Sequence, residues 1–445
     1  MRIRALLASS LAASLAIAST FAAAPLGAQT SALHAEIDRI TASVTPKVVA
    51  WRRDIHEHPE LSGQEVRTAA LVAKHLRSLG MEVREGVGGT GVVGVLKGGR
   101  PGRVVALRAD MDALPVTEQV DLPFKSKVRA QYNGQEVGVM HACGHDNHVA
   151  ILMGAAEVLS GMKARMPGSV VFIFQPAEEG GHPKGGGGAQ WMLVDGAFDD
   201  PKVDAVFGLH VGPGELGAIG YRAGPMMAAS NNYRITVHGK QTHGAVPSAG
   251  IDPIVVGAQV VMGLQTIVSR QVDISAAPAI VTVGTFNAGV RGNIIPDSAV
   301  MTGTIRTFNV AMRNEIFERV KRTAEQIAAS AGARAVVQVD SGYSVTRNDS
   351  TLTARMLPTL QRVVGVEKVN IAPLMTTAED FSFYQERVPG LYFFLGVTPA
   401  GQDPAKAPTN HSPLFFADEG ALPIGVRLIS GLAVDYLGTG RAAVR

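Results

Sequence analysis

The feature that most constrains the fold is a set of four short apolar runs, which alternate with helical segments. Each run is apolar on nearly consecutive residues, as in "RVVALRAD" and "LYFFLGV". This pattern is typical of strands that are covered on both faces, whereas a strand with one solvated face would alternate. The sequence therefore predicts an α/β fold with a mostly parallel sheet, whose strands lie at residues 103–110, 169–179, 203–211 and 391–397.

The middle of the chain follows a different order, which is strand, helix, two strands, helix and strand. This β-α-β-β-α-β order is the split βαβ pattern of ferredoxin-like units. We expect residues 223–340 to form a compact α+β domain. It would be inserted into a larger domain that comprises residues 29–222 and 341–445.

The N-terminus carries the pattern of a secretory signal peptide. Arg2 and Arg4 precede an alanine-rich apolar stretch, and small residues follow around residues 24–28. We predict that residues 1–28 are removed and that the protein is periplasmic or secreted. Without the two arginines the formal net charge of +3 falls to +1. No basic face or lysine run indicates a nucleic-acid partner, and we expect no further membrane-spanning segment.

The stretch "MHACGHDNH", residues 140–148, holds the single cysteine, Cys143, among three histidines. One cysteine cannot close an internal disulfide, so a bridge could only be intermolecular. Cys143 could also be an inert buried residue, a thiolate nucleophile or a metal ligand, because thiolate and imidazole donors suit a borderline divalent cation. This stretch alone does not decide among these alternatives.

Further ligand-type side chains fall at the ends of the predicted strands. Ligands of open α/β sheets bind outside the carboxyl ends of the strands, so these side chains should gather at one rim. A structural zinc site is closed by four ligands, so five ligands with an open position indicate two divalent metal ions with the thiolate between them. Glu178, adjacent to one ligand, is then free to act as general base for an activated water. The candidate ligands are Cys143, His145, Glu179, His210 and His411.

Seven motifs carry a resemblance to a known family. In order they are "RADMDALP", "MHACGHDNH", "QPAEEG", "FGLHV", "THGAVP", "GNIIPDSAVMTGTIR" and "NHSP". Together they resemble the M20 metallopeptidase family, in its amidohydrolase branch of hippurate hydrolases, N-acyl-amino-acid amidohydrolases and auxin-conjugate hydrolases. The resemblance runs from His34 to the C-terminus. It implies a catalytic α/β domain with a dimetal site and an inserted lid domain that often forms a homodimer.

The resemblance also implies roles for individual residues. Cys143 would bridge two metal ions, zinc or manganese with cobalt and nickel as alternatives, and the other four candidates would be terminal ligands. Asp110, in "RADMD", would orient a ligand imidazole from outside the metal shell. Other branches have a histidine where Arg108 stands, and since arginine cannot ligate, His145 would supply that donor.

Three residues of the inserted domain are implied in substrate handling, either in their own subunit or from a partner. His243 would stabilise the oxyanion, and Asn293 and Arg306 would bind the substrate carboxylate, a task that suits the planar arginine fork. Two other histidines are not assigned. We expect His148 on the surface of its helix, and His182 in a flexible glycine-rich surface loop, with an extra metal contact as the alternative.

The sequence thus predicts an exported dimetal amidohydrolase that cleaves the amide bond of an N-acetyl, N-benzoyl or similar N-acyl amino acid. One alternative is a metallo-dipeptidase or carboxypeptidase with the same site. Another is a cysteine hydrolase that uses Cys143 and His145 without metal. A third, from a different class, is a non-catalytic periplasmic metal- or ligand-binding protein, against which Glu178 argues because binding alone needs no base.

Overall fold

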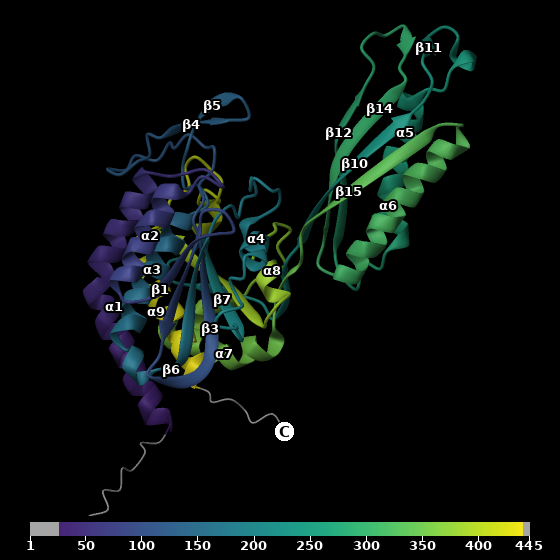
Figure 1. Cartoon of the computed structure of the whole chain (residues 1–445). Helices are drawn as coiled ribbons and strands as arrows, with labels where there is room; N and C mark the ends of the chain where they lie inside the picture. The colour runs from purple at the N-terminus through teal and green to yellow at the C-terminus, as the bar shows by residue number, and fades with distance from the viewer. Residues whose placement is uncertain (1–25, 439–445) are drawn as a thin grey trace, which may run out of the picture.

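An eight-stranded sheet forms the larger part of the molecule (Figure 1). The computed structural model describes residues 26–438, so the predicted signal peptide lies almost wholly outside the described residues. The strand order is β1-β2-β6-β3-β7-β18-β8-β17, and the four central strands β6, β3, β7 and β18 are parallel. The predicted mostly parallel sheet is confirmed. Its strands are β1 (Glu82–Val87), β2 (Gly91–Lys97), β3 (Arg100–Asp110), β6 (Pro167–Gln175), β7 (Ala205–Glu215), β8 (Ile219–Tyr221), β17 (Val369–Ile371) and β18 (Gly390–Thr398).

Helices cover both faces of this sheet, which explains its unbroken apolar runs. In β6, Val170, Phe172 and Phe174 face one core, and the alternate residues Val171 and Ile173 face the other. Because side chains alternate along a strand, both sets must be apolar when both faces are covered. The first core lies against α1 (Leu26–Glu57), α2 (Val66–Ser78), α3 (His145–Gly161), α7 (Ser350–Val364) and α9 (Ala421–Gly438), and the second against α4 (Gly188–Val194) and α8 (Ser382–Gln385).

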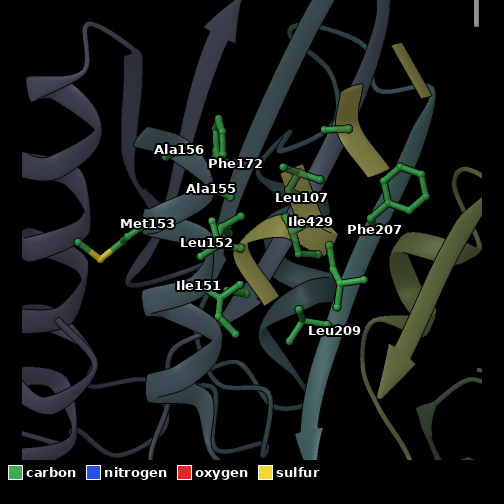
Figure 2. Packing of buried hydrophobic residues seen from close by; sticks show 14 of the residues in the cluster. Leu107, Ile151, Leu152, Met153, Ala155, Ala156, Phe172, Phe207, Leu209 and Ile429 are labelled. Atoms are coloured by element: carbon green, nitrogen blue, oxygen red, sulfur yellow. The ribbon is translucent and has the colours of Figure 1, made fainter. Parts of the chain in front are cut away.

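The helix α3 is buried around its whole circumference. Figure 2 shows Ile151 and Leu152 of α3 packed near Leu107 of β3, Leu209 of β7 and Ile429 of α9. On the side away from the sheet, α3 contacts α1. This helix therefore has no solvated face along most of its length.

A smaller unit stands apart from the larger body (Figure 1). Its antiparallel sheet has the order β12-β14-β10-β15, and α5 and α6 pack on it with a core of their own. Along α6 the buried residues recur at every fourth position, which is the apolar stripe of a helix covering a sheet. The elements follow the chain as β10 (Ala229–His238), α5 (Pro253–Thr266), β12 (Ala279–Ala288), β14 (Ser298–Thr307), α6 (Val310–Ser330) and β15 (Arg334–Tyr343), with a short pair β11 (Thr242–His243) and β13 (Ile294–Ile295).

The chain leaves and re-enters the larger body at neighbouring points. There β9 (Gly224–Met227) pairs with β16 (Thr346–Asn348). The smaller sheet therefore spans residues 229–343 and extends slightly beyond the predicted limit at residue 340. A further hairpin, β4 (Arg129–Tyr132) with β5 (Gln135–Gly138), projects from the larger body.

Two strand ends differ from those predicted by four residues each. The strand β6 ends at Gln175, so Glu178 and Glu179 lie in the following turn rather than at the strand end. The strand β7 continues to Glu215, so His210 lies within the strand. The apolar runs gave the positions of these strands, but the turn and the extension contain no apolar signal that marks their limits.

Two segments are long and apolar enough, by length and composition, to cross a membrane, which differs from the expectation that none follows the N-terminus. They are Pro253–Gln271, which contains α5, and Ala421–Gly438, which is α9. The helix α9 lies mostly inside the first core, and α5 covers the smaller sheet. Packing against a sheet therefore accounts for the apolar composition of both.

Candidate active site

The five predicted metal ligands gather at one rim of the large sheet. Cys143, His145 and His210 form one group, and Cys143, Glu179 and His411 form a second. Within each group the ligand atoms lie within 4.8 Å of one another. Cys143 belongs to both groups, which is the position of a ligand shared by two metal ions.

Gly144 places Cys143 and His145 on either side of a sharp turn. Its φ is +90°, a region that favours glycine, and it directly precedes α3. A Cβ on Gly144 would lie 2.5 Å from Cγ2 of Val211, so the position also lacks room for a side chain. The glycine of "CGH" therefore allows the thiol to end the loop and the imidazole to begin the helix.

Backbone carbonyls fix the orientation of the two buried imidazoles. His145 Nδ1 lies 2.8 Å from the carbonyl oxygen of Asp112, and His210 Nδ1 lies 2.7 Å from that of Val211. A carbonyl oxygen only accepts, so Nδ1 carries a proton in each ring and Nε2 is the nitrogen available to a ligand. His210 Nε2 lies 3.3 Å from Cys143 Sγ.

The loop that carries His411 is tied to the same rim. His411 N donates to the carbonyl of Ala142 at 2.8 Å, and Asn410 Nδ2 donates to the carbonyl of Cys143 at 2.8 Å. The imidazole of His411 reaches Glu179, with Nε2 2.8 Å from Oε1. These contacts bring a residue from far along the sequence beside the turn that carries Glu179.

The residues fit a divalent metal pair. His145 Nε2 is buried and has no hydrogen-bond partner among the described residues, although buried polar atoms are normally paired. Thiolate, imidazole and carboxylate donors together suit borderline divalent cations. Burial lowers the pKa of His145, but the charges of Asp110 and Asp112 outweigh this effect and raise it to about 10. The same carboxylates would stabilise a bound cation.

Asp112 holds the turn that carries the two glutamates. Its Oδ1 accepts from Glu178 N at 3.1 Å, and its Oδ2 accepts from Glu179 N at 3.0 Å. Ala177, just before them, has a φ of +49° and donates its N–H to Glu65 Oε1 at 2.9 Å. Burial raises the pKa of Glu65 to about 7, and the charge of Asp112 contributes to this rise. Two buried acids therefore fix the backbone from which Glu178 and Glu179 project.

Arg108 is buried at the centre of a carboxylate cluster. It donates to Asp110 at 2.5 Å, to Glu379 at 2.9 Å and to Asp380 at 3.0 Å, and its Nε donates to Gln175 at 2.8 Å. Arg108 thus serves as a structural cation for buried carboxylates, as expected for a residue that cannot coordinate metal. Glu379 and Asp380 were not among the predicted site residues, because their acid pair "ED" follows no apolar strand.

Glu178 sits between the metal-ligand groups and this cluster. It is 6% exposed, and its carboxylate lies in one group with His145 and Glu179 and in another with Glu379 and Asp380. Burial raises the pKa of Glu178 well above its usual range, and the neighbouring carboxylates raise it further. A carboxyl group in this position can both accept and return a proton.

The electrostatics do not favour Cys143 as a free nucleophile. Burial raises the pKa of its thiol well above the usual range, and the charges of Glu179 and Glu178 add to the effect. Burial and the neighbouring His148 lower the pKa of His210, so the imidazole that lies 3.3 Å from the thiol does not supply a positive charge to a thiolate. A bound metal cation would supply the missing positive charge.

Two expectations about histidines were wrong. His148 is buried rather than on a helix surface, with Nδ1 2.5 Å from Asp110 Oδ1 and Nε2 accepting from Val211 N at 2.8 Å. Asp110 therefore orients His148, and its other carboxylate oxygen lies 3.8 Å from Nε2 of the predicted ligand His145. His182 is neither a metal contact nor a surface residue. It is 6% exposed, stacks on Trp191, and uses both ring nitrogens in contacts with backbone atoms of Gly88 and Lys184.

The three predicted residues of the smaller unit do not join this rim within the single chain. His243 lies in β11, at the end of the smaller unit away from the larger body (Figure 1). Asn293 lies beside it, since its carbonyl accepts from Gly244 N at 2.8 Å. Arg306 is half-buried in β14, and burial lowers its pKa. Their roles in substrate handling remain predictions.

A parallel sheet with paired glutamates and a shared cysteine at its rim defines a metal-dependent hydrolase. Residues 106–435 match the sequence profile of peptidase family M20/M25/M40. The chain is 42% identical over 392 residues to thermostable carboxypeptidase 1 of Saccharolobus solfataricus. The aligned residues cover 87% of this chain and 95% of the relative. It is 38% identical over 377 residues to an N-acetyl-L-cysteine deacetylase of Bacillus subtilis, with coverage of 84% and 85%.

A solved structure agrees with these relatives. The structure of a dinuclear metal-binding peptidase of the M20 family from Bacillus subtilis is similar, with a TM-score of 0.74 and 36% identity. The similarity covers 89% of this chain and 99% of that one. The chain belongs to the M20 peptidase family, in its amidohydrolase branch, and is a metal-dependent hydrolase of amide bonds.

Proposed function

We propose that the protein is an exported amidohydrolase that cleaves N-acyl amino acids, with an acetyl, benzoyl or similar acyl group. The observation that carries the proposal is the pair of ligand groups that share Cys143, with Glu178 buried beside them. Cys143, His145, Glu179, His210 and His411 would hold two divalent cations. When bound, the cations would supply Lewis acidity toward water and the substrate carbonyl.

Glu178 supplies the proton transfers of the reaction. Its carboxylate takes a proton from the attacking water, whose oxygen bonds to the amide carbon. The C–N bond then breaks, and Glu178 returns the proton to the leaving nitrogen, which yields a carboxylic acid and a free amine. Asp112 keeps Glu178 in place for both transfers, because it holds the backbone of the turn on both N–H groups.

The substrate class rests on the relatives and on the smaller unit. One relative is named for the deacetylation of N-acetyl-L-cysteine, which is an N-acyl amino acid. Arg306 and Asn293 would bind the carboxylate of such a substrate, and His243 would stabilise the oxyanion. These residues would reach the rim through movement of the smaller unit or from a partner subunit. The exposed β12 edge of the smaller sheet supports a homodimer formed through this unit.

A metallo-dipeptidase or carboxypeptidase activity is the second candidate. It is favoured by the 42% identity to thermostable carboxypeptidase 1 of Saccharolobus solfataricus. The same rim would serve both activities, because both cleave an amide bond next to a carboxylate-bearing residue. Steady-state kinetics with N-acetyl and N-benzoyl amino acids, free dipeptides and N-blocked peptides would separate the two.

Elemental analysis of the purified protein, paired with hydrolysis of N-acyl amino acids, tests the proposal. We expect about two metal ions per chain, zinc or manganese before cobalt or nickel, and activity that is lost on chelation and restored by metal. Activity that survives chelation would favour the cysteine hydrolase. Metal binding without hydrolysis of any amide would favour a binding protein. Export is tested separately, by locating the protein in periplasmic and culture fractions of its cells.

A further inference from the structure

The peptide group between Glu178 and Glu179 is held at both of its polar ends. Its N–H donates to Asp112 Oδ2 at 3.0 Å. Its carbonyl oxygen, which belongs to Glu178, accepts from the hydroxyl of Tyr343 at 2.5 Å. The plane of this peptide sets the directions in which both glutamate side chains leave the backbone. Tyr343 and Asp112 therefore act on the general base and on a metal ligand together.

Tyr343 belongs to the smaller sheet. It is the last residue of β15, and it pairs with Ser230 of β10. The register of this pair shifts between Ser230 and Asn232, so residues 341 and 342 form a bulge directly before Tyr343. Bulges bend a strand and change the direction of the side chain that follows. The smaller unit thus extends one side chain into the catalytic turn of the larger body.

The surroundings leave little room for Tyr343 to move. A Cβ on Gly187 would lie 2.7 Å from the Tyr343 hydroxyl, and the ring packs edge-on against Phe383 with centroids 6.1 Å apart. A Cβ on Gly342 would lie 2.1 Å from the carbonyl oxygen of Ser230, so the bulge accepts only glycine without displacement. The hydroxyl and the bulge therefore occupy space that is available only because Gly187 and Gly342 have no side chains.

We propose that Tyr343 is a positioning residue that couples the smaller unit to the catalytic turn. Its hydroxyl fixes the 178–179 peptide, and its place at the end of β15 means that displacement of the smaller sheet displaces both glutamates. The proposal rests on the proposed function for its catalytic consequence. Its structural part, the restraint of the turn, is independent of any substrate.

The test compares Tyr343→Phe with a matched control, Tyr384→Phe. Tyr384 is also buried in the larger body, but the one hydrogen bond of its hydroxyl among the described residues goes to Met192 Sδ, at 3.4 Å. Hydrogen exchange of the metal-free proteins reports the restraint directly. In Tyr343→Phe we expect the segment 176–187 to exchange at least about 5-fold faster than in the wild type, and in Tyr384→Phe we expect no change.

Kinetics report the catalytic consequence in the metal-loaded enzyme. We expect kcat of Tyr343→Phe to fall about 10-fold with KM changed less than about 2-fold, because a displaced base misaligns a proton transfer without removing substrate contacts. Unchanged exchange, or equal acceleration in both variants, would overturn the proposal. Faster exchange with unchanged kcat would overturn its catalytic part. A wild type without amidase activity would contradict the proposed function but would leave the exchange comparison decisive for the restraint.

A second variant tests the coupling while keeping the hydroxyl. Gly342→Ala displaces the bulge, so it should reproduce the fall in kcat although Tyr343 is intact. Wild-type kcat in a folded Gly342→Ala variant would overturn the coupling. The coupling can also be tested in the opposite direction, from the catalytic turn to the smaller unit, in the Tyr343→Phe protein itself. Its segment 339–346 should also exchange faster, and unchanged exchange there would overturn the coupling even if Gly342→Ala does not fold.

Discussion

The rim of the large sheet and the tip of the smaller unit differ in how their polar side chains are held. At the rim, Asp112 accepts from two backbone N–H groups and from Ser62 Oγ at 2.6 Å, and Arg108 donates to three buried acids. At the tip, His243 is exposed, and the one hydrogen bond of its imidazole among the described residues is accepted by Nδ1 from Ala245 N, two residues away. The fold therefore fixes the groups that carry the chemistry. Whether the proposed substrate-binding residues of the smaller unit reach the site depends on how that unit is placed against the rim.

The largest expected effect follows from replacing the general base. Glu178→Gln keeps the shape of the side chain but cannot take a proton. We expect kcat to fall about 10³- to 10⁴-fold, and metal content to stay at the wild-type level because Glu179 remains. Steady-state kinetics and elemental analysis measure the two quantities. Glu57→Gln, which changes an exposed acid of α1, is the control and should have wild-type kcat. A Glu178→Gln enzyme with more than a tenth of wild-type kcat would remove Glu178 from this role.

The second effect concerns the stability of the rim. Arg108→Met leaves Asp110, Glu379 and Asp380 buried without their cation, so the free energy of unfolding should fall by about 3 to 5 kcal/mol. Arg53→Met provides the contrast, because Arg53 is half-exposed in its ion pair with Glu419. Its loss should cost less than about 1 kcal/mol. Urea unfolding monitored by circular dichroism measures both. Similar losses for the two variants would mean that the buried cluster is not tightly coupled.

The large sheet and the gathering of the five candidate ligands at its rim could be predicted because each had a local signal. Apolar runs indicated the strands, and donor residues near their carboxyl ends indicated the rim. The position of His148 was wrong for a physical reason. Residues three apart lie on the same side of a helix, so His148 follows His145 into the interior, whereas the prediction placed it on the one solvated face that a helix in an α/β layer usually has. The helix α3 has none here, because α1 and α9 cover the sides that the sheet does not.

The partners of the site could not be predicted, because they come from distant segments without a local pattern. Glu379 and Asp380 reach Arg108 across about 270 residues of sequence, and the contact exists only once β3 and the loop before α8 are packed together. Tyr343 reaches Glu178 from the other sheet. The sequence could suggest which residues bind metal, whereas the residues that hold them in place required the three-dimensional structure.

A smaller effect tests whether the tip takes part in catalysis at all. If His243 stabilises the oxyanion, His243→Ala should lower kcat about 10²-fold while metal content and melting temperature stay unchanged. His238→Ala is the matched control, since His238 belongs to the same unit but lies at the end of β10. Equal kcat in the two variants would show that the tip has no catalytic role. The comparison between the two regions would then be one between an active site and a purely structural unit.

The smallest effect tests whether the two regions are separate in stability. Asp252 caps α5 of the smaller unit by accepting from Ile254 N at 2.8 Å, and Asp349 caps α7 of the larger body by accepting from Leu352 N at 2.7 Å. Removing either cap by substitution with alanine should cost about 1 kcal/mol. If the regions unfold separately, hydrogen exchange should accelerate only around α5 in Asp252→Ala and only around α7 in Asp349→Ala. Acceleration of both helices in either variant would show one cooperative unit. In that case the smaller unit could not move freely against the rim, and its residues would have to reach a substrate from a partner subunit.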